Sequence, residues 1–318
     1  MFFQAGFNRD FKLARVLSWN LSIERQIGQN FVVRGAYVAS ESYHLVNAVD
    51  RNPGFFSAAG ARLKYPEFTQ VLEMASWATA SYQSGQFTVE KRFSHGVQFQ
   101  SNYTYSKTLD SASIGTLAFT GSVADPNNMQ NNRGWSAFNF PHVFVTNFVW
   151  EMPKLQNMNP FARGVLGGWQ WSGIWRIQSG APFGIRPGFG NNRSLLQTGG
   201  DRADYVPGVD ISSKQGDKND WLHEFFSTDA FQPNQPGTLG NTPRALFHGP
   251  RTDAWDLGIA KNWTMKERYR VQFRWEMFNA FNHVNLGNPS TNTGDARFGR
   301  ISSAPTACEM QARLKFVF

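Results

Sequence analysis

The C-terminal segment of the chain alternates strictly between apolar and polar side chains. A β-strand points successive side chains to opposite faces, so this segment has one apolar face and one polar face. Its length is close to the roughly 9–11 residues that a tilted strand needs to cross the hydrocarbon of a membrane. Alone, the segment fits a membrane strand and an amphipathic edge strand of a soluble sheet equally well. The apolar positions are Met310, Ala312, Leu314, Phe316 and Phe318, and the polar positions are Gln311, Arg313 and Lys315.

The same alternation recurs along the chain and predicts about nine strands in total. Only alternate residues of a barrel strand need to be apolar, which suits a chain with 41% hydrophobic residues and a mean hydropathy of −0.42. No apolar run approaches the ~18 residues of a spanning helix. The other predicted strands are Val16–Ile27, Phe31–Ser40, Ala80–Arg92, Val97–Ser106, His142–Met152, Trp169–Gln178, Trp255–Trp263 and Tyr269–Met277.

The connections between these strands run short, long, short, long, medium, very long, short and long. An up-and-down transmembrane β-barrel has this pattern, with short periplasmic turns and long extracellular loops. We therefore predict an all-β, antiparallel barrel whose long extracellular loops span about 41–79, 110–141, 179–252 and 279–309. An odd strand number is unusual for a bacterial barrel. We thus expect the C-terminal part of a larger barrel, with Phe318 at the end of an unpaired edge.

The aromatic residues and the charged residues fall on opposite faces of the predicted strands. Aromatics are 15% of the chain, and at a membrane interface they would form girdles. The polar face would line the lumen, where arginines could either attract anionic solutes or pair with acids such as Glu24, Glu151 and Glu276. The candidate interface aromatics are Trp19, Tyr103, Tyr105, Trp150, Trp169, Trp171, Trp175, Trp255, Trp263, Tyr269 and Trp275. The candidate lumen charges are Arg176, Arg268, Arg270, Arg274 and Glu276.

No motif indicates catalysis, a metal or a cofactor. The six histidines show no HExxH spacing, and neither a GxSxG nor a Walker A sequence occurs. His142 and His248, near loop ends, leave a hydrolase of the outer membrane as a minor alternative. The single cysteine, Cys308, rules out an intrachain disulfide framework. The net charge of +8 is dispersed, and a single-stranded nucleic-acid groove needs aromatics and charges on one face, so we expect no nucleic-acid partner.

Several segments, in order along nearly the whole chain, together resemble the barrel of TonB-dependent outer-membrane transporters, specifically the Oar-like group. No single segment is diagnostic, but the ordered set is fairly specific. The segments are 19–25 (WNLSIER), 89–96 (VEKRFSHG), 102–107 (NYTYSK), 167–170 (GGWQ), 178–183 (QSGAPF), 278–283 (FNAFNH) and 314–318 (LKFVF).

The resemblance implies a barrel of about 22 strands with an N-terminal plug inside it. It also implies that the terminal strand, through Leu314, Phe316 and Phe318, is read by the outer-membrane barrel assembly machinery. We expect no signal peptide, because residues 1–20 lack an apolar core, and no plug is visible either. TonB would act only through the absent plug, so we expect this chain alone not to perform energised uptake.

The expected surroundings are outer-membrane lipid in a Gram-negative bacterium, and the transported solute is left open. The alternative from a different class is a soluble β-rich protein that binds carbohydrate or another surface. Neither of these two interpretations makes the chain an enzyme.

Overall fold

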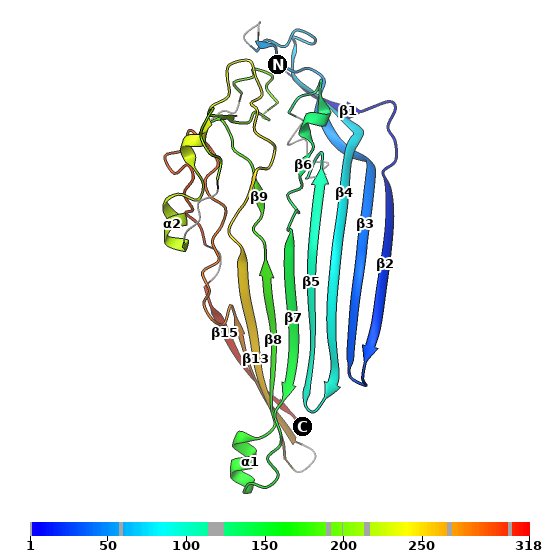
Figure 1. Ribbon diagram of the computed structural model, residues 1–318, viewed down its shortest axis with the longest axis vertical. Helices are drawn as coiled ribbons and strands as arrows, with labels where there is room; N and C mark the ends of the chain where they lie inside the picture. The colour runs from blue at the N-terminus through cyan, green and yellow to red at the C-terminus, as the bar shows by residue number, and fades with distance from the viewer. Residues whose placement is uncertain are drawn as a thin grey trace.

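The computed structural model describes residues 2–318 except 57–59, 114–123, 189–191, 199, 213–216, 266–268 and 305–306. One large open sheet dominates it, and its strands follow the order β2-β3-β4-β5-β7-β8-β13-β14-β15 (Figure 1). Neighbours along this path pair antiparallel, as predicted. The strands are β2 (Arg15–Ile27), β3 (Phe31–Asp50), β4 (Phe68–Ser94), β5 (Val97–Asp110), β7 (His142–Glu151), β8 (Trp169–Gln178), β13 (Thr252–Met265), β14 (Tyr269–Phe278) and β15 (Glu309–Val317).

The register places the predicted apolar positions of neighbouring strands side by side. Trp171 of β8 lies opposite Ile259 of β13, which lies opposite Trp275 of β14. Trp275 in turn lies opposite Ala312 of β15. A shift of one residue would move every side chain of a strand to the other face, so this register is what keeps one face of the whole sheet apolar.

The short connections gather at one end of the sheet and the long ones at the other (Figure 1). Between β4 and β5, Ser94 pairs with Val97 across His95 and Gly96 alone. His95 and Gly96 have positive φ angles, 51° and 77°, as the two turn residues of a type I′ hairpin require. A side chain at position 96 would also strike the backbone oxygen of Glu151, at 2.6 Å. Gly28, with φ 61°, supplies the turn between β2 and β3.

The predicted bounds of the loop 41–79 are wrong at both ends. Strand β3 continues to Asp50 and β4 starts at Phe68, so the connection covers only 51–67. The alternation fades here because both faces of the extended strands are covered. Val49, Leu72 and Met74 are buried although they lie outside the amphipathic part of the strands. The residues before the first predicted strand also contain a strand that the alternation did not predict. This strand, β1 (Phe2–Phe7), pairs with β4 in parallel.

The other long connections contain short elements that no periodicity revealed. Segment 110–141 holds η2 (Met129–Asn132) and β6 (Gly134–Trp135), and segment 152–168 holds helix α1 (Pro160–Leu166). Segment 179–251 holds β9 (Pro182–Phe183), β10 (Asp204–Tyr205), α2 (Lys218–His223), η3 (Thr228–Ala230), β11 (Phe231–Gln232) and β12 (Phe247–His248). Among the described residues, helices are too short and too polar to span a membrane.

Segments 179–251 and 279–308 fold together into one unit, which we call the cap. Its centre is Phe226, which is completely buried and stacks on Phe247 at a ring-centroid distance of 5.4 Å. Leu286 and Ile301 from the second segment join the same cluster. The two predicted loops are therefore irregular in secondary structure but share a packed apolar core, above one end of the sheet (Figure 1).

The sheet does not close on itself. Strands β15 and β2 form its two edges and do not pair with each other. The open edge at the C-terminal strand is as predicted, and Phe318 follows β15 with 89% of its surface exposed. The architecture is thus an open section of an up-and-down antiparallel barrel.

Candidate functional site

The strand register places the eleven predicted aromatic residues on the same, apolar face of the sheet. Trp175 and Trp255 are register partners near the cap, and their rings stack at 4.6 Å with an interplanar angle of 17°. Nearer the turns, Trp169 and Trp263 meet edge to face at 6.4 Å. Large apolar side chains such as Leu257 lie between these two levels.

The opposite face carries four of the predicted charged residues, and the structure pairs only some of them. The four are Arg176, Arg270, Arg274 and Glu276. Nε of Arg274 lies 2.8 Å from Oε1 of Glu276, and the Gln311 amide donates to the same carboxylate at 2.6 Å. Arg176 and Arg270 have no carboxylate within ion-pair distance in the described part of the chain. The charges of both arginines are therefore not neutralised by a carboxylate of the described residues.

Two further residues were expected on this face, Glu24 and Arg268. Glu24 pairs with Arg34 rather than with one of the predicted arginines, at 2.7 Å. The predicted lumen charge Arg268 lies outside the described residues.

Ionic contacts attach the long connections to the ends of the strands. Arg244 of the cap binds the Asp110 carboxylate at the end of β5, and its guanidinium also donates to the backbone oxygen of Trp135 at 3.0 Å. Arg202 donates to the backbone oxygen of Asn131 at 3.0 Å. Burial, and then the nearby Arg244 cation, lower the pKa of Arg202 below its usual value.

The two cap arginines lie close enough for the charge of Arg244 to act on Arg202, and the sequence did not predict either of them as a site residue. Both lie in a long stretch without periodicity, so no pattern in the sequence distinguishes them from ordinary loop residues.

The two histidines of the hydrolase alternative have partners that do not suit nucleophilic catalysis. Nδ1 of His142 lies 2.7 Å from the Tyr103 hydroxyl, on the apolar face. Nε2 of His248 lies 3.1 Å from the amide nitrogen of Asn139, and its ring packs against Trp135. Burial lowers the pKa of His248, partly offset by a backbone hydrogen bond with Asn139. Across the described residues, His, Cys, Asp and Glu side chains form no cluster of three or more that could hold a metal.

Comparison with known proteins identifies this architecture. A family model described as "Outer membrane beta barrel domain" matches residues 2–312. No curated protein matches the chain in sequence.

Two solved structures resemble the chain at low identity. The outer membrane transporter YddB from Escherichia coli is 12% identical, with 97% of this chain and 33% of that one covered and a TM-score of 0.49. FpvA from P. aeruginosa, in a complex with a heterologous pyoverdine and iron, is 9% identical, with coverages of 94% and 27% and a TM-score of 0.43. The chain thus spans about one third or less of the length of either transporter.

Proposed function

Because the chain belongs to the outer membrane beta barrel domain family, we propose that it forms the C-terminal part of the wall of a TonB-dependent receptor and transporter. The observation that carries this proposal is the apolar face, which continues without a register break from β7 to β15. An antiparallel sheet with such a face and short turns at one end has the features that the wall of a membrane barrel requires. The four long connections are then extracellular, and the short turns are periplasmic.

The apolar face also distinguishes the proposal from a soluble sheet protein. Leu21 and Ile23 of β2 expose 68% and 73% of their surface, and Leu314 and Phe316 of β15 are exposed as well. Soluble proteins rarely expose contiguous apolar patches of more than a few hundred Å². In a membrane, lipid covers these apolar side chains, whereas in a soluble carbohydrate-binding protein they would be exposed to water at a cost in free energy.

The polar face and the cap are the proposed solute route. Arg176 and Arg270 lie on the lumen side without an acidic partner in the described residues, and Arg202 belongs to the cap. Unpaired guanidinium groups in a confined aqueous channel concentrate anions. We therefore assign the route to solutes that carry negative charge, and we assign no catalytic role to any residue.

Energised uptake needs more than the wall. In the proposed transporter, TonB acts through a plug domain, and the terminal strand engages the barrel assembly machinery during insertion. The segment described here supplies the lipid contact and part of the solute route, and it is not expected to drive uptake alone.

Membrane fractionation and gel mobility test the barrel. The protein is expected in the outer-membrane fraction and to migrate differently on a detergent gel before and after boiling. A protein that stays soluble without detergent, with one mobility, would contradict the barrel.

Transport is tested separately, by comparing uptake of small anions into cells with and without the intact protein, in the presence and absence of TonB. Uptake that requires both the intact protein and TonB supports the transporter, whereas uptake that requires the protein but not TonB would indicate a passive barrel. If replacement of His142 and His248 abolished a hydrolytic activity of the pure protein, the hydrolase alternative would replace this proposal.

A further inference from the structure

The connection between β7 and β8 folds back onto the apolar face of the sheet. The indole nitrogen of Trp263 donates to the backbone oxygen of Gly164 at 2.8 Å, and that of Trp169 donates to the oxygen of Val165 at 2.8 Å. Both tryptophans belong to the apolar face. Helix α1 is therefore attached to the lipid side of the wall, beyond the turn ends of the strands (Figure 1).

Lys261 places a cation on the apolar face, where a charge is costly. It is only 3% exposed, and its Nζ donates to the backbone oxygen of Gly167, just after α1. The same atom lies 5.3 Å from the ring centroid of Trp169 and 5.6 Å from that of Trp263. Carbonyls at a helix C-terminus and aromatic faces both stabilise a cation. The charge of Lys261 is thus used to hold α1 against the wall.

The free side of α1 is apolar. Phe161 and Val165, one helical turn apart, are exposed by 81% and 48%, and Leu166 by 51%. Met158, just before the helix, is exposed as well. This surface is continuous with the lipid-facing wall to which α1 is attached. A short amphipathic helix in this position lies in the membrane interface with its apolar side among the acyl chains.

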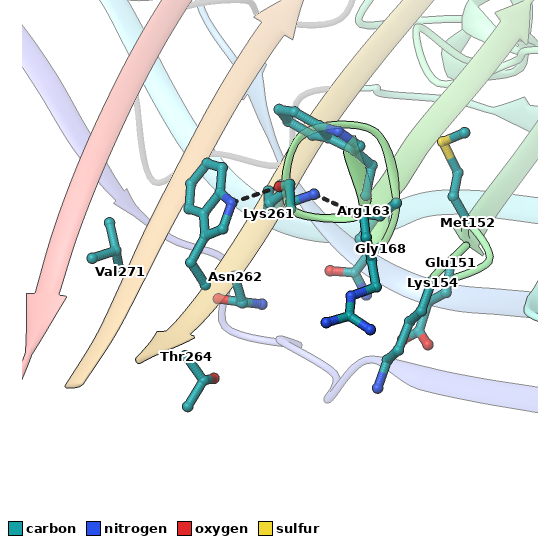
Figure 2. Close-up of a pocket in the computed structure, with 15 residues that line it drawn as sticks. Glu151, Met152, Lys154, Arg163, Gly168, Lys261, Asn262, Thr264 and Val271 are labelled. Atoms are coloured by element: carbon teal, nitrogen blue, oxygen red, sulfur yellow. Dashed lines mark hydrogen bonds between the residues drawn. The ribbon is translucent and has the colours of Figure 1, made fainter. Parts of the chain in front are cut away.

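Two basic side chains stand beside this apolar surface. Arg163 and Lys154 line a depression of about 800 Å³ between α1 and the sheet, together with Glu151. Neither cation has a carboxylate within ion-pair distance in the described part of the chain. Figure 2 shows the charged ends of both side chains directed away from Lys261. The depression thus holds two basic side chains that have no acidic partner among the described residues, beside one carboxylate, at the turn end of the sheet.

We propose that residues 153–168 form an interfacial binding site for an anionic glycerophospholipid of the leaflet at the turn end of the barrel. Arg163 and Lys154 bind the phosphate and headgroup, while Phe161, Val165 and Leu166 contact the acyl chains. Lys261, Trp169 and Trp263 position the helix and do not touch the lipid headgroup. This inference rests on the proposed assignment of the apolar face to lipid.

Depth measurements test the placement of α1. A fluorescent probe is attached to Phe161→Cys in a Cys308→Ser background of the intact protein, reconstituted in phosphatidylcholine vesicles. Lipids with spin-labelled acyl chains are expected to quench it, as they quench a probe at Ile23→Cys on the wall. A probe at Phe138→Cys, exposed at the cap end, is the aqueous control.

The two possible failures are distinguishable. If the Ile23 probe is quenched by the labelled lipids and the Phe161 probe behaves like the Phe138 probe, α1 does not lie in lipid and this inference is overturned. If neither the Ile23 nor the Phe161 probe is quenched, the membrane-wall assignment itself fails.

Lipid retention tests the headgroup site. The intact protein is equilibrated with mixed phosphatidylglycerol and phosphatidylcholine micelles, and bound lipid is counted by native mass spectrometry. The Lys154→Gln, Arg163→Gln double variant is expected to bind phosphatidylglycerol about thirtyfold more weakly, because each basic side chain near an anionic lipid surface contributes separately. Phosphatidylcholine binding is expected to stay unchanged.

A matched control replaces two basic residues elsewhere, with Arg9→Gln and Lys12→Gln before β2. Equal phosphatidylglycerol binding by the Lys154, Arg163 variant and this control would overturn the site. Displacement of the lipid by inorganic phosphate at millimolar concentration would also overturn it, because the site would then select phosphate and not lipid.

Discussion

Nη1 of Arg62 lies 2.8 Å from Oδ2 of Asp50, and this ion pair is almost completely buried, with 4% and 0% of the two side chains exposed. The pair joins the end of β3 to the connection 51–67. The Asp50 carboxylate also accepts hydrogen bonds from the backbone nitrogens of Asn52 and Val71. It thus organises the region in which β3 and β4 extend beyond their amphipathic parts.

Replacement of Arg62 by Met is expected to destabilise this extension by about 3–5 kcal/mol, because a buried carboxylate loses its partner. Limited proteolysis and hydrogen exchange of residues 45–75 measure the loss. The control is Arg34→Met, which breaks the exposed pair with Glu24 and should cost no more than about 1 kcal/mol. Equal protection of the region in both variants would contradict the prediction.

A charge on the apolar face should be far more costly than the same charge on the polar face. Leu257 lies between the two aromatic levels, opposite Gly173 and Met277. Leu257→Arg is expected to lower the free energy of unfolding in lipid by about 2–4 kcal/mol. Ser172→Arg, on the polar face of β8 at a similar depth, should change it little. Denaturant titration in vesicles measures both, and similar losses would show that the faces are assigned wrongly.

Acid should weaken the cap through His248. Burial lowers the pKa of this residue in the folded state below its usual 6.5, so the unfolded chain takes up the proton more readily. The stability that depends on neutral His248 is therefore complete above about pH 6.5 and falls as the pH decreases toward the folded-state pKa.

Thermal unfolding at pH 8 and pH 5 measures this effect. His248→Gln cannot titrate and should lose less stability between the two pH values than the natural protein. An identical pH dependence of both proteins would exclude His248 as a contributor.

Deletion of Phe318 should impair insertion into the outer membrane in cells without impairing folding in detergent. Phe318 lies outside β15 and is 89% exposed, so its removal costs little packing. The ratio of membrane-inserted to unassembled protein measures insertion, and boiling-dependent gel mobility measures folding. Phe138→Ala, which removes an equally isolated exposed ring at the cap end, is the control. A loss of both insertion and folding would assign the residue a structural role instead.

The predicted strands and faces agree with the structure where the signal is local. Trp169, Trp171 and Trp175 share a face because alternation follows from the geometry of one strand, whatever it pairs with. The hairpin at His95–Gly96 was likewise readable as a short turn, since glycine supplies its positive φ angle. These features need no contact between distant parts of the chain.

The candidate site was only partly predictable. The polar-face arginines follow from alternation. That Arg274 pairs with Glu276, two residues along the same strand, depends on side-chain geometry that alternation does not specify. Arg202 and Arg244 had no signal at all, because their partners are distant in the sequence. Asn131 lies 71 residues from Arg202, and Asp110 lies 134 residues from Arg244. Loop sequences do not encode such contacts in a periodic form.

The sequence by itself determined the all-β class, the alternation of short turns and long connections, and which side of each strand faces lipid, since these depend only on residues adjacent along the chain. Only the tertiary structure decided that Phe226 is buried in a packed cap, that β3 and β4 extend beyond the apolar band, and that Lys261 on the apolar face is compensated by α1. Each of these arises from contacts between residues far apart in sequence, whose free energy no local pattern records.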